Sequence, residues 1–164
     1  MSAARKIVIL GGTGFVGRHL VLRLHQDSDL PIEVLSRNRE LLRDLAVLPR
    51  ARLTSCNVYD PAALQARFAG AAAVINLVGV LQSSGFGGAG FYRAHVQLTE
   101  GVIAACRAAG VKRLLQMSSL RAGEGDSHYL KSRGQAEARV KASGLDWTLF
   151  QPSVIFGPGD GLFC

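Results

Sequence analysis

The stretch KIVILGGTGFVG, residues 6–17, decides the fold of this chain. It opens on a short apolar run, residues 7–10, which is typical of a strand buried on both faces. Three glycines follow with the spacing GxGxxG. Beyond them, Val16, Leu20 and Leu24 recur on one face of a helix. The stretch therefore predicts a strand, a tight turn and a helix, in that order.

A GxGxxG spacing alone is a weak signal, but here it stands between a strand and a helix, with a second strand about 30 residues after the start of the first. In such a turn, the first glycine permits the tight bend, the second lets a pyrophosphate approach the backbone, and the third lets the helix pack close to the strand. The helix N-terminus would attract the phosphates. We therefore expect a dinucleotide site at Gly11, Thr13, Gly14, Phe15, Val16 and Gly17. The alternative is a glycine-rich turn without a ligand.

Strands and helices continue to alternate along the rest of the chain. Apolar runs predict strands at 7–10, 32–35, 53–55, 73–77, 114–117 and 147–150. Gly70, Gly110 and Gly144 each follow a helical segment, where glycine takes a left-handed turn cheaply. Asp60 and Pro61 match an N-cap and a first helical residue. The alternation predicts one α/β domain over residues 1–164: a three-layer Rossmann fold, with a doubly wound parallel sheet and helices on both faces.

The composition excludes several classes of protein. With 48% hydrophobic and 19% charged residues, the chain is globular. No apolar run approaches the roughly 20 residues of a membrane helix or resembles a signal peptide, so we expect no transmembrane segment and a cytoplasmic location. The three cysteines are widely spaced, which predicts neither disulfides nor a metal site. The net charge of +7 comes from scattered arginines without interleaved aromatic residues, which argues against nucleic acid.

The residues after the second predicted strand bear on the choice of cofactor. An Asp or Glu is usual there in NAD sites, because it binds the ribose hydroxyls. Here Ser36 and Arg37 occupy the place, with Arg39 nearby. A guanidinium can hold a 2′-phosphate through two hydrogen bonds. The sequence therefore favours NADP(H), with NAD(H) left open. The alternative for the arginines is a role in a solvated loop.

Further motifs follow the glycine turn in order. They are CNVYDP at 56–61, NLVG at 76–79, MSS at 117–119, YLKSRGQAE at 129–137 and QPSVIFGPGD at 151–160. With GGTGFVG at 11–17, they make the chain resemble the extended and atypical short-chain dehydrogenase/reductases, the NAD-dependent epimerase/dehydratase family. Within that family, the chain is most similar to the branch of the 39 kDa accessory subunit of respiratory complex I and its bacterial relatives.

The resemblance implies where the cofactor lies. The adenine would lie near Asn57 and Val58. The cofactor would be flanked by Leu77, Val78 and Gly79, and the nicotinamide would lie beside Pro152. The family also has a smaller C-terminal substrate region, which we expect this chain to lack.

The resemblance also implies a catalytic set. Ser118 or Ser119 would be the polar partner of a reacting carbonyl, and Tyr129 would be the general acid/base. In the family, a lysine four residues after the tyrosine lies on the same helical face and favours the phenolate. Here that position holds Arg133, which is planar, bulkier and not interchangeable with lysine. The alternative for the tyrosine is a purely structural role.

These features leave several functions open. The chain could be an NADP-dependent oxidoreductase or epimerase/dehydratase acting on an unknown small molecule. It could equally be a non-catalytic NADP(H)-binding accessory or sensor protein, like the complex I subunit, at the periphery of a larger complex. A third alternative is a redox-sensing regulator. The resemblance also implies homodimers, which many relatives form.

Overall fold

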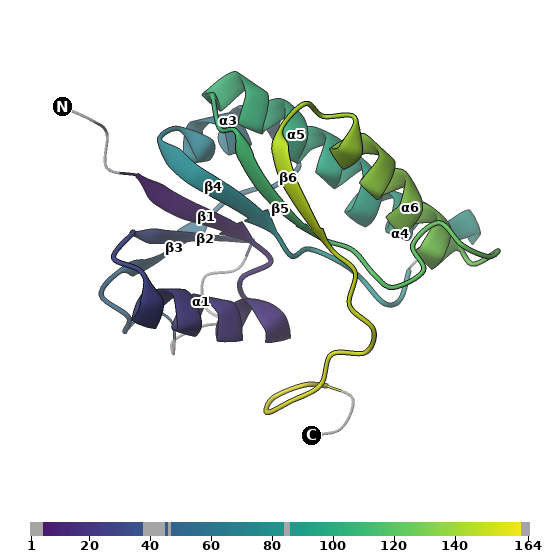
Figure 1. Cartoon of the computed structure of the whole chain (residues 1–164), viewed down its shortest axis with the longest axis horizontal. Coiled ribbons are helices and arrows are strands. Elements are labelled where there is room, and N and C mark those ends of the chain that lie inside the picture. The colour runs from purple at the N-terminus through teal and green to yellow at the C-terminus, as the bar shows by residue number, and fades with distance from the viewer. Residues whose placement is uncertain (1–4, 38–44, 46, 84–85, 162–164) are drawn as a thin grey trace.

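The computed structural model describes residues 5–37, 45, 47–83 and 86–161. Within these residues, six strands form one sheet in the order β3-β2-β1-β4-β5-β6, and every pairing is parallel (Figure 1). The strands are β1 (Lys6–Leu10), β2 (Ile32–Ser36), β3 (Ala51–Ser55), β4 (Ala71–Asn76), β5 (Arg113–Met117) and β6 (Asp146–Phe150). The predicted parallel, doubly wound sheet is confirmed.

Helices cover both faces of the sheet, as predicted. One face carries α1 (Phe15–Asp27), and the other carries α3 (Pro61–Phe68), α5 (Leu98–Ala109) and α6 (His128–Lys141) (Figure 1). β1 explains this arrangement, because its side chains alternate between the two layers. Val8 and Leu10 pack in the apolar cluster under α3 and α5, whereas Ile7 and Ile9 pack in the cluster under α1. A strand buried on both faces needs an uninterrupted apolar run, and β1 has one.

The predicted helix ends are also confirmed. Gly70, Gly110 and Gly144 have φ angles of 74°, 74° and 72°. The Asp60 carboxylate accepts hydrogen bonds from the backbone N–H groups of Ala62 and Ala63 and so caps α3. Local sequence signals therefore define where these helices begin and end.

One helix carries a feature that the sequence pattern does not predict. After the short η2 (Phe86–Gly88), the segments α4 (Ala89–Phe91), η3 (Tyr92–Gln97) and α5 follow without a break in helical backbone. η3 is a π-helical turn, a form that occurs most often as a single turn near functional sites. It contains the buried His95.

The strand order fixes where a ligand can bind. From β1, the chain builds the sheet outward through β2 and β3, then returns to the other side of β1 to continue with β4, β5 and β6. The order reverses between β1 and β4, so a crevice opens there at the carboxyl ends of the strands.

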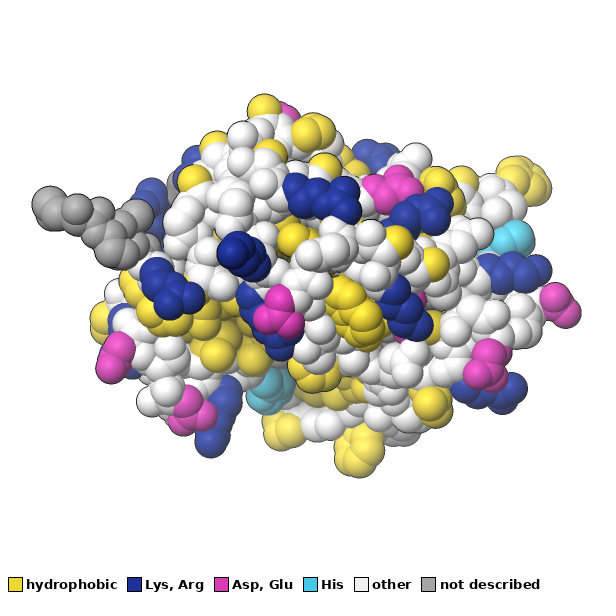
Figure 2. Space-filling model, turned by 45° about the horizontal axis from the view of Figure 1, so that its top comes forward, with side chains coloured by type: hydrophobic (Ala, Val, Ile, Leu, Met, Phe, Trp, Pro, Cys, Tyr) yellow, Lys and Arg dark blue, Asp and Glu magenta, His cyan; other side chains and the backbone are white. Residues whose placement is uncertain are grey.

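The charged side chains are distributed over the surface. Figure 2 shows Lys and Arg side chains placed singly or in small groups among apolar and uncharged ones on the face turned to the viewer. Among the described residues, no helix combines the length and the apolar character that a membrane crossing requires.

Candidate functional site

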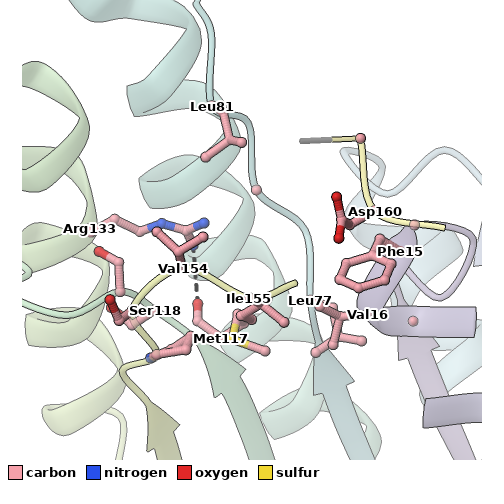
Figure 3. Close-up of a pocket in the computed structure, with 18 of the residues that line it drawn as sticks. Phe15, Val16, Leu77, Leu81, Met117, Ser118, Arg133, Val154, Ile155 and Asp160 are labelled. Carbon is pink, nitrogen blue, oxygen red and sulfur yellow. Dashed lines mark hydrogen bonds between the residues drawn. The ribbon is translucent and has the colours of Figure 1, made fainter. Parts of the chain in front are cut away.

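A cavity of about 820 Å³ lies at the carboxyl edge of the sheet, where the strand order reverses (Figure 3). Five segments that are far apart in the sequence form its walls: the glycine turn with the start of α1, the chain after β4, the chain after β5, the first turns of α6, and residues 152–161. The predicted site residues in these walls are Gly11, Gly14, Phe15, Val16, Gly17, Leu77, Gly79, Ser118, Ser119, Tyr129, Arg133 and Pro152.

Two glycines of the turn are required by the packing of the chain itself. Gly11 has a φ of +75°, and a Cβ on it would lie 2.9 Å from the backbone carbon of Leu77 and the backbone nitrogen of Val78. A Cβ on Gly17 would collide with the backbone of Gly11 and Gly12. These two positions therefore let α1 and the end of β4 approach the turn closely.

Gly14 differs, because the packing of the chain does not require a glycine there. Its φ of −77° and ψ of −179° suit any residue, and the nearest atom to an added Cβ is the Gly11 carbonyl oxygen at 3.4 Å. Gly14 is the N-cap of α1, where no side chain caps the helix, and it lines the cavity. The space that a larger side chain would occupy belongs to the cavity, at a helix N-terminus that attracts phosphate. The turn therefore fits the pyrophosphate of a dinucleotide.

Six predicted cofactor residues do not line this cavity. They are Thr13, Ser36, Arg37, Asn57, Val58 and Val78. Arg37 is exposed and directly follows β2, and Asn57 is exposed and follows β3, so both lie at the same edge of the sheet as the cavity. Val58 lines a separate hollow beside α3 and α5. Arg39 lies outside the described residues.

Tyr129 lies in the first turn of α6, whose N-cap is Ser127. Its ring contacts Phe91 and His95 edge to face, with centroid distances of 5.8 and 5.5 Å. The Arg133 guanidinium carbon lies 5.4 Å from the centre of the ring. The predicted spacing of four residues thus brings the phenol and the guanidinium together at the cavity.

Arg133 is only 6% exposed. Its Nη1 donates a hydrogen bond to the Met117 carbonyl oxygen at 3.1 Å (Figure 3), and its buried Nε has no hydrogen-bond partner. A Cβ on Gly79 would collide with Arg133 Nη2, so the guanidinium in this position packs against the glycine.

The structure separates the roles of the two serines. The Ser118 hydroxyl donates to Glu137 Oε1 at 2.6 Å, so its proton is committed to a carboxylate. Ser119 lines the same cavity, and its Oγ is buried and has no hydrogen-bond partner. Of the two serines, Ser119 is therefore the one whose hydroxyl proton is not bound by a carboxylate.

Glu137 is a site residue that the sequence analysis missed. Its carboxylate also accepts hydrogen bonds from Gln151 Nε2 at 2.7 Å and from Lys141 Nζ at 3.3 Å. Burial raises the pKa of Glu137, but the hydrogen bonds from Ser118, Gln151 and Lys141 outweigh burial and lower the pKa overall. The sequence did carry a signal for it. Glu137 follows Arg133 by four residues, as Arg133 follows Tyr129, and this spacing places the three side chains on one helical face.

His95 joins three elements around Tyr129. Its Nε2 accepts a hydrogen bond from the Val80 N–H at 3.2 Å, so Nδ1 carries the proton and donates to Ser132 Oγ at 2.8 Å. Ser132 in turn donates to the Tyr129 carbonyl oxygen at 2.8 Å. Burial, reinforced by the charge of Arg133, lowers the pKa of His95 to about 3. The imidazole is therefore neutral at physiological pH.

Apolar residues complete the cavity (Figure 3). The sequence analysis did not select Leu81, Met117 and Ile155, whereas Val154 belongs to the segment from Pro152 to Val154 that the resemblance places beside the nicotinamide. Asp160, also in the wall, accepts a hydrogen bond from the Gly157 N–H at 2.7 Å and so holds its loop. The apolar run after Pro152 was the signal for this wall.

Comparison with known proteins identifies the family of this chain. Residues 11–159 match a family described as NAD(P)H-binding. The chain is 34% identical to a ceramide reductase from Caulobacter vibrioides, over 96% of this chain and 50% of the relative. It is 30% identical to a 2-alkyl-3-oxoalkanoate reductase from Stenotrophomonas maltophilia, over 94% and 52%. The chain thus spans about half the length of these relatives.

Solved structures share the fold. A Rossmann-fold NAD(P)-binding family protein from Shigella flexneri matches with a TM-score of 0.70 and 25% identity, over 92% of this chain and 68% of that one. The UDP-glucuronic acid 4-epimerase from Bacillus cereus, solved with NAD, matches with a TM-score of 0.79 and 16% identity, over 93% and 58%.

Proposed function

The chain belongs to the NAD(P)H-binding family, and from that premise we propose that it is the dinucleotide-binding domain of an NADP(H)-dependent reductase. One observation carries the proposal: the glycine turn opens onto the same cavity as Tyr129, Ser119 and Arg133. A phosphate held at Gly14 and a carbonyl held at Tyr129 would therefore share one cavity. The residues proposed to bind the cofactor and those proposed to act on the carbonyl both lie in this half of the relatives' length.

The proposed reaction is the reduction of a ketone. When bound, NADPH supplies the hydride that the carbonyl carbon receives. Ser119 donates a hydrogen bond to the carbonyl oxygen, and the Tyr129 phenol gives that oxygen a proton, which completes a secondary alcohol. The apolar wall of Leu81, Val154 and Ile155 suits a substrate with an apolar chain. The names of the two reductases above, ceramide and 2-alkyl-3-oxoalkanoate, describe compounds of that kind.

The preference for NADP(H) rests on Arg37, exposed at the end of β2. We expect Arg37→Glu to weaken NADPH binding by about tenfold or more and to leave NADH binding nearly unchanged, because a carboxylate repels a 2′-phosphate that only NADPH carries. Paired fluorescence titrations measure both affinities. Arg52→Glu, an exposed arginine of β3, is the control with the same charge change. Equal losses of affinity for NADPH and NADH would mean that Arg37 does not contact the 2′-phosphate.

Catalysis has its own test in Tyr129→Phe. We expect this variant to keep the affinity for NADPH and to lose reduction of a 3-oxo substrate by about 100-fold or more, since the proton donor is removed while the ring remains. Tyr59→Phe, outside the cavity, is the matched control. The measurement is NADPH oxidation followed by absorbance. A variant that retains full turnover would show that the phenol is not the acid.

A second function has an observation of its own. Arg133 stands where the resembled family has lysine, and the Ser118 proton is committed to Glu137. These departures favour a non-catalytic NADP(H)-binding accessory protein, similar to the complex I 39 kDa subunit, which would act within a larger complex or as a homodimer. Tight NADPH binding by the wild-type chain without turnover of any oxo compound would support this second function.

A further inference from the structure

Arg133 is a buried cation without a counter-ion among the described residues. It is 6% exposed, its Nη1 donates a hydrogen bond to the neutral Met117 carbonyl, and its Nε has no partner. Two buried carboxylates, one on α6 and one in the cavity wall, accept hydrogen bonds from other groups. Glu137 binds Ser118, Gln151 and Lys141, and Asp160 binds the Gly157 N–H.

Such a charge is costly, because burial removes its water and no anion replaces it. An anion entering the cavity would complete the site, and the planar guanidinium matches a carboxylate. Gly79 supports this interpretation, since its missing side chain leaves the space that the guanidinium fork occupies. The guanidinium therefore lies directly against the backbone of Gly79 at the cavity wall.

The rest of the cavity limits what the anion can be. Leu81, Val154 and Ile155 line it and are 74%, 62% and 38% exposed, so they offer an apolar surface to a ligand. The Arg133 guanidinium carbon lies 5.4 Å from the centre of the Tyr129 ring. The guanidinium and the tyrosine are therefore close enough for one small molecule to contact both.

We infer that the cavity takes an oxo-carboxylate with an apolar chain. The carboxylate pairs with Arg133, the carbonyl one or two carbons away faces Tyr129 and Ser119, and the chain lies along Leu81, Val154 and Ile155. This inference rests on the proposed function and deepens it, because it separates an acidic substrate from neutral ketones with equally apolar chains.

The test uses a pair of probes that differ in charge but not in chain length, octanoate and octanamide. Neither carries a keto group, so neither is reduced. Calorimetric titrations of the full chain, with and without saturating NADPH, are expected to show octanoate binding about tenfold or more tightly than octanamide. Arg133→Gln should abolish this preference while its NADPH affinity stays the same. Lys131→Gln removes an exposed cation two residues away on the same helix and should preserve the preference.

Each other outcome has a defined meaning. Equal binding of the two probes to the wild-type chain overturns the inference and requires no variant. A preference that survives Arg133→Gln also overturns it, as does a loss of NADPH affinity alone, which would mean that the guanidinium holds the dinucleotide. If NADPH fails to bind the wild-type chain, the proposed function fails, and the two probes still test Arg133 in the unliganded protein. If Arg133→Gln does not fold, Arg133→Lys is the second variant. It keeps a cation but loses the paired N–H donors of the guanidinium, and we expect it to weaken the preference for octanoate over octanamide.

Discussion

Replacing Gly14 with valine is expected to abolish dinucleotide binding, with a loss of affinity of about 100-fold or more for NADPH and NADH alike. The branched side chain would fill the part of the cavity where the pyrophosphate meets the N-terminus of α1. The fold should tolerate the change, because the φ and ψ of Gly14 are extended and ordinary for valine. The substitution should therefore lower the affinity for the dinucleotide without disturbing the fold.

Two companion variants make the result interpretable. Gly14→Ala places one carbon 3.4 Å from the Gly11 carbonyl oxygen, so we expect it to bind more weakly than wild type and more tightly than Gly14→Val. Gly101→Ala adds a carbon in α5 with nothing within 4 Å and should leave the affinity unchanged. Thermal unfolding checks that all three fold. A Gly14→Val chain that folds and binds NADPH normally would show that the glycine turn is not part of the cofactor site.

The wild-type chain is expected to lose about 2 kcal/mol more stability between pH 6 and pH 4 than a His95→Gln variant. Burial and the charge of Arg133 lower the pKa of His95 from 6.5 to about 3 in the fold. The unfolded chain therefore takes up a proton before the folded chain does. The stability that comes from a neutral His95 is complete above pH 6.5 and is lost as the pH falls from 6.5 towards 3.

Urea unfolding at pH 6, 5 and 4 measures this difference. Glutamine can still accept a hydrogen bond and donate one, but it does not titrate. The free energy of unfolding should therefore fall more steeply with decreasing pH in the wild-type chain than in the variant. This holds whatever stability the substitution costs at neutral pH. If the free energy of unfolding depends on pH equally in the two chains, the imidazole is already charged in the fold, or water reaches it. Carboxylates such as Glu137 titrate in both chains and cancel in the comparison.

Most of the fold is predictable because its signals are local. The apolar run of β1, the N-cap of α3 and the three helix-ending glycines each act within a few residues. Strand boundaries are less accurate where the pattern weakens. β3 begins at Ala51 rather than at residue 53, because exposed Arg52 interrupts the apolar signal at the edge of the sheet. β4 begins at Ala71, where small alanines resemble loop and helix residues equally.

The site is predictable where it depends on spacing and not where it depends on tertiary contacts. The glycine turn and the Tyr129–Arg133 pair each span a few consecutive residues, and both line the cavity. The bond between Ser118 and Glu137 joins residues 19 apart in sequence, and the bond between His95 and Ser132 joins residues 37 apart. No periodicity encodes such pairs, because the first exists only after α6 packs beside the end of β5 and the second only after α6 packs against the π-helical turn.

The five-segment wall of the cavity has a consequence for how the chain assembles. Parallel strands can be joined only by long crossovers, so the turn after β1 and the segment after β6 meet last, when all the crossovers are in place. A partly assembled chain offers a dinucleotide only fragments of its site. Bound cofactor should therefore slow unfolding of the whole domain instead of protecting one end of it. Each tenfold excess over Kd would add about 1.4 kcal/mol to the stability of every strand at once.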